Sequence, residues 1–447
     1  MLDVLYRRRL ERDLDAWQER GLVTPEAAEE MLASIGQEAR PRTAIILGFL
    51  GAILIAFSAI AFVAANWADM ARPFRLGLLV AGMAACYGIA ALMSLARHPW
   101  FADAAIFAGS ALFGASIMLV AQSYHISGDY PDALLMWGVG AFIAALLGPS
   151  RASLLLALVV LSLWSWYEVV DYGWMVHWPY VVAVVLIGVV AGAWHWSSGI
   201  HLSVLALVGW IVVSVLNSAY ENDWSAASSV CVGCGAALVF FALGRFLSAH
   251  VHWTKASAFG PVFGIYGLIG FLAMLILLQF AIFDSGIPDL EIDRPPLMVA
   301  GVLIALAGLL LAITRAGLRS ILLDGAVPLA MGIAAIGLSL AAARNEAFAE
   351  SLGMQILLGV LVMVAGVWTV AFGNRVGSRA AATFGLIAFA AEVLYLYFVT
   401  FGTLLDTAVF FLTGGILMIA LAAILVRLQR RLTPADGGAR AAGGARA

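Results

Sequence analysis

Long apolar stretches separated by short polar segments occupy the chain from Thr43 to Val426. A hydrocarbon core of about 30 Å is crossed by about 20 helical residues, so each stretch predicts a membrane-spanning helix. Two stretches are short, which leaves open a re-entrant or differently tilted course for 132–148 or 152–170. The pattern predicts fourteen spans, at 43–65, 74–96, 101–122, 132–148, 152–170, 178–196, 200–219, 227–246, 259–283, 296–313, 321–343, 354–372, 380–399 and 404–426.

The polar segment 1–42 predicts a small helical module ahead of the first span. A first amphipathic helix ends at Gly21, and Thr24 and Pro25 then supply the N-cap and first turn of a second helix that runs to about Ile35. Two such short helices bury little core by themselves. Two roles remain open: a cytoplasmic cap docked on the loops, or a contact with another copy or with other membrane proteins.

These segments predict three parts and one fold class. Residues 1–42 form the helical module, 43–426 the transmembrane bundle, and 427–447 a disordered tail of Ala, Gly and Arg. The expected fold is an all-α polytopic transmembrane bundle with a small N-terminal cytoplasmic helical hairpin.

Charge predicts the orientation of this bundle. Four of the 24 Lys and Arg residues, namely Arg72, Arg75, Arg294 and Arg344, fall on one side of the predicted spans, and the remaining 20 fall on the side of the termini. Positive charge is retained in the cytoplasm, so both termini are predicted to be cytoplasmic. Because 1–42 lacks the apolar core of a signal peptide, the first span is expected to insert as its own anchor.

Composition and motifs argue against several functional classes. The chain is 63% hydrophobic and 11% charged, whereas soluble proteins are about a quarter charged. It contains no nucleotide-binding glycine motif, no G-x-S-x-G and no H-E-x-x-H, so catalysis is the least supported class, although a lipid- or glycan-modifying enzyme stays open. The pair Cys231 and Cys234 is flanked by glycines, which favours close helix packing. We expect no cofactor, no metal ion and no nucleic-acid partner; the lipid bilayer is the expected partner.

Three short segments carry a family resemblance. They are 17–24 (WQERGLVT), 62–67 (FVAANW) and 121–129 (AQSYHISGD). In this order and setting they resemble a bacterial multi-pass membrane protein family catalogued as domain of unknown function 2157, with 43–150 as the family-like part of the bundle. The resemblance implies a bacterial inner-membrane protein and implies no catalytic residues.

Polar and aromatic residues gather at the outer ends of the first and third predicted spans. With neighbouring aromatic residues they would suit a cation, a sugar or a peptide. The alternative is the ordinary enrichment of aromatic residues at membrane interfaces. His125 is the member whose charge changes near neutral pH. The candidates on this outer face are Asn66, Trp67, Gln122, Tyr124, His125 and Asp129.

Glu392 lies twelve residues into its span, roughly 18 Å along the helix. Ionisable residues at such depth are costly unless they are paired, and they are functional candidates for that reason. Tyr395 at i+3 shares its helix face, and Gln279 of the ninth span is a second candidate partner. Burial disfavours the charged carboxylate, so we expect a protonated acid. Two roles remain open for Glu392. It takes part in proton coupling or substrate binding, or it only forms a hydrogen bond that stabilises the helical bundle.

Asp324 lies near the cytoplasmic end of its span, four residues before Pro328. Proline cannot donate to the carbonyl of residue 324, which leaves a free oxygen beside a carboxylate. Broken helices of this kind bind ions in transporters, although single proline kinks are common in membrane helices.

Two functional hypotheses follow. The first is a transporter or permease-like protein for a small solute that uses Glu392, Tyr395, Gln279 and Asp324, together with the outer loop 122–132. The second is a non-catalytic membrane scaffold or envelope-maintenance component that binds other membrane proteins. A water-accessible cavity that reaches Glu392 favours transport, and a solid bundle with a lipid-filled groove favours a scaffold.

Overall fold

A computed structural model of the chain describes residues 20–34, 70–125, 128–250, 258–283, 294–314 and 322–401, with isolated positions at 10, 13–15, 17–18, 415–416, 419–420 and 423. The predicted span 43–65, nearly all of 404–426 and the tail 427–447 therefore lie outside the described residues. The chain divides into two units, residues 1–78 and 79–447, and each is described by itself.

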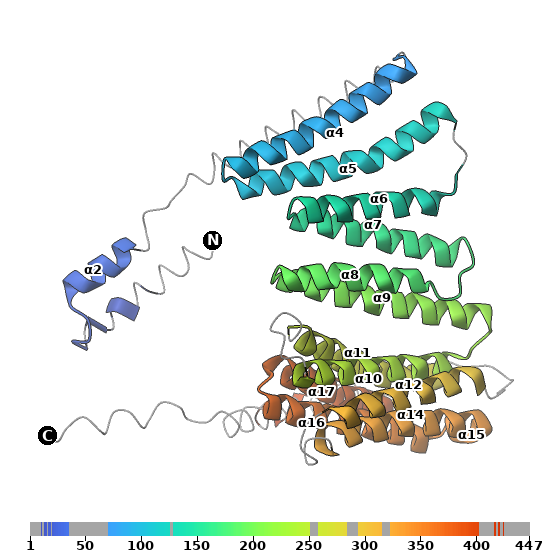
Figure 1. Ribbon diagram of the computed structural model, residues 1–447. Helices are drawn as coiled ribbons and strands as arrows, with labels where there is room; N and C mark the ends of the chain where they lie inside the picture. Colours follow the sequence, from blue (N-terminus) through green and yellow to red (C-terminus); the bar gives the residue numbers. More distant parts are fainter. Residues whose placement is uncertain are drawn as a thin grey trace. The chain divides into compact units, whose positions relative to one another are not determined.

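The first unit contains the helix α2 (Pro25–Ser34), labelled in Figure 1. The hydroxyl of Thr24 accepts a hydrogen bond from the backbone N–H of Ala27 at 3.3 Å, which confirms the predicted N-cap. Gly21 adopts a left-handed conformation with φ of 66°, and its N–H donates to the carbonyl of Gln18 at 2.9 Å. Leu14 and Ala28 are the buried apolar residues described in this unit.

The described elements of the second unit are all helices, and the first of them, α4 (Arg72–Leu95), begins just before it. The helices that follow are α5 (Pro99–Tyr124), α6 (Tyr130–Leu147), α7 (Arg151–Val170), α8 (Trp178–Ala193), α9 (Ser197–Glu221), α10 (Ala226–His250), α11 (Phe259–Phe283), α12 (Arg294–Ile313), the π-helical turn η2 (Leu322–Ala326), α14 (Val327–Arg344), α15 (Glu346–Ala349), α16 (Leu352–Val376) and α17 (Arg379–Phe401).

The described helices coincide with twelve of the predicted spans. Among the described residues, eleven helices are long and apolar enough to cross a membrane. The segments expected to be short, α6 and α7, are continuous helices of 18 and 20 residues. The short apolar helix is instead α8, with 16 residues, because the chain turns at Trp194 and His195. The polytopic helical bundle is thus confirmed.

Three apolar clusters of described residues organise the second unit. The largest is formed by α10, α11, α12, α14, α16 and α17, the second mainly by α6, α7 and α8, and a small third one by α8, α9 and α11. Figure 1 shows the antiparallel pairs α6–α7 and α8–α9 in successive layers beside the α10–α17 group. Small residues allow close helix contact: a Cβ on Gly385 of α17 would lie 2.7 Å from the carbonyl oxygen of Gly366 of α16.

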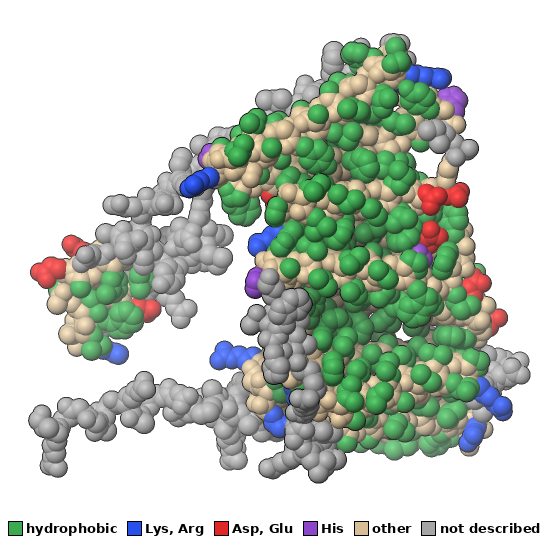
Figure 2. Space-filling view, in the orientation of Figure 1, with side chains coloured by type: hydrophobic (Ala, Val, Ile, Leu, Met, Phe, Trp, Pro, Cys, Tyr) green, Lys and Arg blue, Asp and Glu red, His purple; other side chains and the backbone are tan. Residues whose placement is uncertain are grey.

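Alternating helix directions place the helix ends on two sides, which we call the Arg245 side and the His177 side. The Arg245 side carries Arg97, Arg151, Arg245, Arg375 and Arg379. The His177 side carries Arg294, Arg344 and most of the described acids, and Figure 2 shows red side chains along its edge from α6 to α10. The acids between α5 and α10 on this side are Asp129, Asp132, Glu168, Asp171, Glu221 and Asp223, and Glu346 and Glu350 follow after α14. The charge asymmetry is therefore present at the helix ends.

Candidate functional site

Glu392 and Gln279 form a buried polar pair between α17 and α11. The side-chain amide nitrogen of Gln279 donates a hydrogen bond to Glu392 Oε2 at 2.8 Å. The two residues are 2% and 1% exposed. Glu392 lies thirteen residues after Arg379, roughly 20 Å from the start of α17. The structure thus brings together two of the residues singled out in the sequence, at depth within the membrane-spanning bundle.

This pair is incompletely satisfied. Glu392 Oε1 and Gln279 Oε1 are both buried, and neither has a hydrogen-bond partner among the described residues. Buried polar atoms nearly always have a hydrogen-bond partner. Two adjacent side chains that each keep one buried acceptor without a partner are therefore a candidate functional site. An ionised carboxylate offers only acceptors, whereas a proton on Oε1 converts that atom into a donor. The protonated Glu392 that was expected from its burial stays a prediction.

Helix α16 contacts the Glu392–Gln279 pair at Gly359. A Cβ on Gly359 would lie 2.9 Å from Glu392 Oε1 and 2.8 Å from both terminal methyl carbons of Leu396. The absence of a side chain at Gly359 therefore makes the space that the carboxyl group occupies. Three helices, α11, α16 and α17, together position this acid.

Tyr395 takes a different partner from the one its spacing suggested. Its ring packs edge-on against Phe280, with centroids 5.3 Å apart. Since Glu392 Oε1 is unpartnered and Oε2 accepts from Gln279, the carboxyl group is oriented by the amide and not by the Tyr395 hydroxyl. Tyr395 of α17 therefore contacts α11 through the ring of Phe280.

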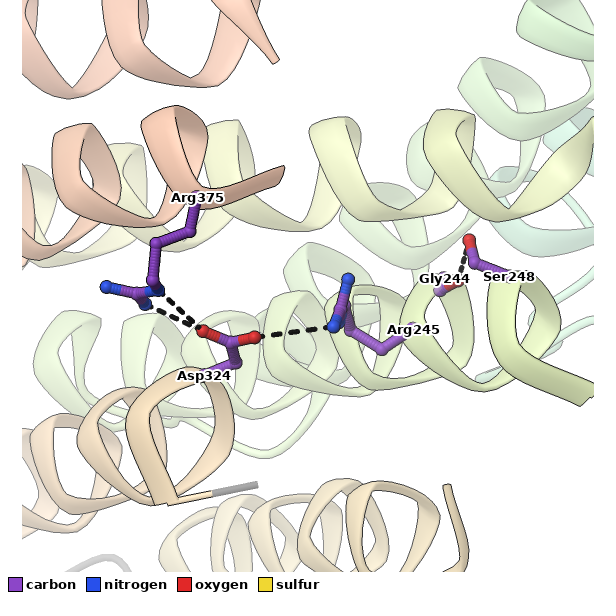
Figure 3. Close-up of polar contacts among 5 residues, drawn as sticks. All are labelled: Gly244, Arg245, Ser248, Asp324 and Arg375. Atoms are coloured by element: carbon purple, nitrogen blue, oxygen red, sulfur yellow. Dashed lines mark hydrogen bonds and ion pairs between the residues drawn. The ribbon is translucent and has the colours of Figure 1, made fainter. Parts of the chain in front are cut away.

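Asp324 binds two arginines at the Arg245 side. Arg375 of α16 donates from Nε and Nη2 to Asp324 Oδ1 at 3.2 and 2.7 Å. Arg245 of α10 donates from Nη2 to Oδ2 at 3.3 Å. Figure 3 shows the two guanidinium groups reaching the carboxylate from opposite sides. We call Asp324, Arg245 and Arg375 the arginine clasp.

The clasp changes the interpretation of the proline kink. The chain before Pro328 is a π-helical turn, Leu322–Ala326, and Asp324 of this turn contacts Arg245 of α10 and Arg375 of α16. The carboxylate, expected to be available for an ion, is engaged by two cations. Their position at helix ends was visible in the sequence, but the pairing depends on tertiary contact between α10, η2 and α16.

At the His177 side, a buried histidine lies within an aromatic enclosure. His177 Nδ1 lies 3.1 Å from the hydroxyl of Ser165, and the rings of Trp164 and Trp174 contact its imidazole edge-on at 4.4 and 5.3 Å. The indole N–H of Trp210 donates to the carbonyl of His177 at 3.0 Å. Burial lowers the pKa of His177, and the Glu168 carboxylate partly opposes this by raising it.

The predicted outer loop is partly described. His125 has φ of 53° at the C-terminal end of α5, where its Nδ1 lies 3.0 Å from the carbonyl oxygen of Gln122. Tyr124 is exposed, and Asp129 occupies the N-cap position of α6 without a side-chain capping bond. Asn66 and Trp67 lie outside the described residues. The structure therefore joins Gln122 to His125 locally, and a shared ligand site for this loop stays a prediction.

Two described cavities are apolar. The larger, about 260 Å³, is a groove between α9, α10 and α11 that includes Val212, Gly233, Gly270 and Met274. The smaller, about 190 Å³, lies between α6, α7 and α8. Glu392 lines neither of them. Among the described residues, no group of three or more His, Cys, Asp or Glu side chains is arranged to hold a metal ion.

Comparison with known proteins finds a family match over the N-terminal third of the chain. Residues 15–154 match the model of a predicted membrane protein family, domain of unknown function 2157. The resemblance inferred from the three short segments is thereby confirmed over this range. No curated protein matches the chain. No solved structure matches it either. The comparisons agree with a multi-pass membrane protein and supply no activity.

Proposed function

We propose that the protein is a permease-like transporter of a small solute in which Glu392 takes up and releases a proton within the membrane. The observation that carries this proposal is the pair of unpartnered oxygens, Glu392 Oε1 and Gln279 Oε1, in an otherwise buried contact. A proton on Glu392 Oε1 would give the pair a second donor. Loss of that proton leaves a buried anion, which a change of conformation would have to expose to water. An acid at this depth with only one of its two oxygens partnered supports a functional role in addition to packing.

The proposal includes an orientation. The protein lies in the bacterial inner membrane with both termini in the cytoplasm, which makes the Arg245 side cytoplasmic and the His177 side external. The excess of arginine at the described helix ends of the Arg245 side supports this arrangement.

Proton flux in proteoliposomes tests the transport proposal without knowledge of the solute. The full chain is reconstituted with an enclosed pH-sensitive dye, and a potassium diffusion potential drives proton entry. We expect Glu392→Gln to reduce flux to the level of empty vesicles and Glu221→Gln, at an exposed acid of α9, to leave it unchanged. Equal flux in wild type and Glu392→Gln, both above empty vesicles, would contradict the proposal.

A second function, a scaffold that binds other membrane proteins, is favoured by the apolar groove between α9, α10 and α11. The groove does not include Glu392, which is the arrangement expected of a bundle without a transport path. Cross-linking in membranes distinguishes the two functions. Recovery of a defined partner, together with no flux in wild type, would select the scaffold.

A further inference from the structure

The arginine clasp has more positive charge than its carboxylate neutralises. Two guanidinium groups share Asp324, so these three side chains sum to one net positive charge. The side chains of Arg245 and Arg375 are 22% and 37% exposed, whereas that of Asp324 is 10% exposed. The acid therefore lies beneath two partly open cations.

Both arginines retain hydrogen-bond donors that Asp324 does not use. Arg375 donates from Nε and Nη2 to one oxygen, and Arg245 donates from Nη2 to the other. A guanidinium carries five N–H donors in a planar fork. Asp324 holds the two forks near each other despite their mutual repulsion, which prepares them for a second anion with several oxygens.

The clasp also lies at headgroup depth. Arg245 is nineteen residues after the start of α10 at Ala226, roughly 29 Å along the helix, which is about the thickness of the hydrocarbon core. Towards the bundle interior, Arg245 lies over the ring of Phe372 at 5.5 Å, and Phe241 and Trp368 pack beside that ring. The aromatic rings on one side of the arginines and the open guanidinium groups on the other are suited to the boundary between lipid acyl chains and headgroups.

We propose that the arginine clasp is a binding site for a phosphate-bearing anion at the membrane interface, with Arg375 and Arg245 as its donors and Asp324 as the residue that positions them. Phosphate is the fitting chemistry because its oxygens accept bidentate bonds from guanidinium groups. Basic sites between membrane helices recognise anionic lipid headgroups by these contacts. This site is separate from Glu392 and independent of any transport role.

Native mass spectrometry of the purified full chain tests this proposal with two lipids, phosphatidylglycerol and phosphatidylcholine. We expect wild type to retain phosphatidylglycerol selectively, and Arg375→Gln to weaken that retention about tenfold, as expected for a lost charge-assisted contact. Arg151→Gln is the matched control, because Arg151 is an exposed arginine on the same side at the start of α7. Equal retention of both lipids by wild type, or equal losses in the two arginine variants, would overturn the proposal.

Two further experiments distinguish a lipid headgroup from soluble phosphate and test whether Asp324 positions the arginines. Protection of wild type against thermal unfolding by inorganic phosphate, lost in Arg375→Gln and without selective lipid retention, would assign the site to soluble phosphate. Asp324→Asn keeps both arginines and removes the carboxylate that positions them, so selective retention should weaken in a protein that stays folded and monodisperse. Unchanged selective retention in Asp324→Asn would contradict the positioning role of Asp324.

Discussion

Gln279 donates to Glu392 across the α11–α17 contact at 2.8 Å, and each side chain keeps one buried oxygen without a partner. The two residues are 113 positions apart in sequence. The proposed uptake and release of a proton rests on this contact, because only the protonated acid supplies a new donor.

Gln279→Leu should destabilise the folded protein by about 1–3 kcal/mol, since it leaves both carboxyl oxygens of Glu392 buried without a donor. The double variant Gln279→Leu with Glu392→Leu should regain most of that stability, because replacing both partners by apolar groups is nearly neutral. Denaturant unfolding in detergent measures both variants. Additive losses in the double variant would contradict a direct coupling between the two residues.

Gly359→Ala should displace the Glu392 carboxyl group, because the new methyl would lie 2.9 Å from Oε1 and 2.8 Å from the methyl carbons of Leu396. We expect a stability loss of about 1–3 kcal/mol from overpacking and a reduced proton flux. Gly337→Ala in α14 is the matched control, since its Cβ would meet nothing within 4 Å. Indistinguishable stability and flux in the two variants would show that Gly359 does not shape the site.

His177 should make stability depend on pH. Burial lowers its pKa in the folded protein, with Glu168 partly opposing the shift, whereas the unfolded chain titrates near 6.5, roughly the ordinary histidine value. Just below that pH the unfolded state binds more protons than the folded state. Stability is therefore full above about pH 6.5 and falls as pH decreases through the lowered pKa, by at most about 1.4 kcal/mol per pH unit from this residue.

Unfolding measured between neutral and mildly acidic pH checks this dependence. His177→Asn should flatten the acid limb of the curve, and His195→Asn, at an exposed histidine, should leave it unchanged. An acid limb that persists in full in His177→Asn would assign the dependence to other groups.

Cysteine labelling should place Glu221 and Arg151 on opposite faces of the membrane. In a background with the three native cysteines replaced by alanine, a membrane-impermeant maleimide added outside should label cysteine at position 221 and not at position 151. Permeabilised cells should label both positions. The reverse pattern in intact cells would invert the proposed orientation.

The sequence predicted the fold well because lipid selects the same apolar length in every span. Twelve spans matched described helices, and the discrepancy in length fell at α8, where His195 turns the chain in a left-handed conformation. Glu392 and Gln279 stood out because polar side chains are rare inside apolar spans. The two residues could therefore be chosen as candidates from the sequence alone.

Partner choice was less predictable. Spacing placed Tyr395 on the face of Glu392, but the lateral position of α11 against α17 gives that acid Gln279 and gives Tyr395 the ring of Phe280. Arg245 and Arg375 were counted as topology signals, and their convergence on Asp324 depends on the packing of α10 and α16 around a π-helical turn. Such contacts are tertiary and leave no periodic trace in the sequence.

Infrared difference spectroscopy of the reconstituted protein tests the protonation of Glu392 most directly. The account predicts a protonated carboxylic acid band at neutral pH that is absent from Glu392→Gln, shifts in Gln279→Leu and disappears reversibly when the membrane is energised. Spectra of wild type and Glu392→Gln without any difference in the carboxylic acid region, at acidic as well as neutral pH, would contradict it.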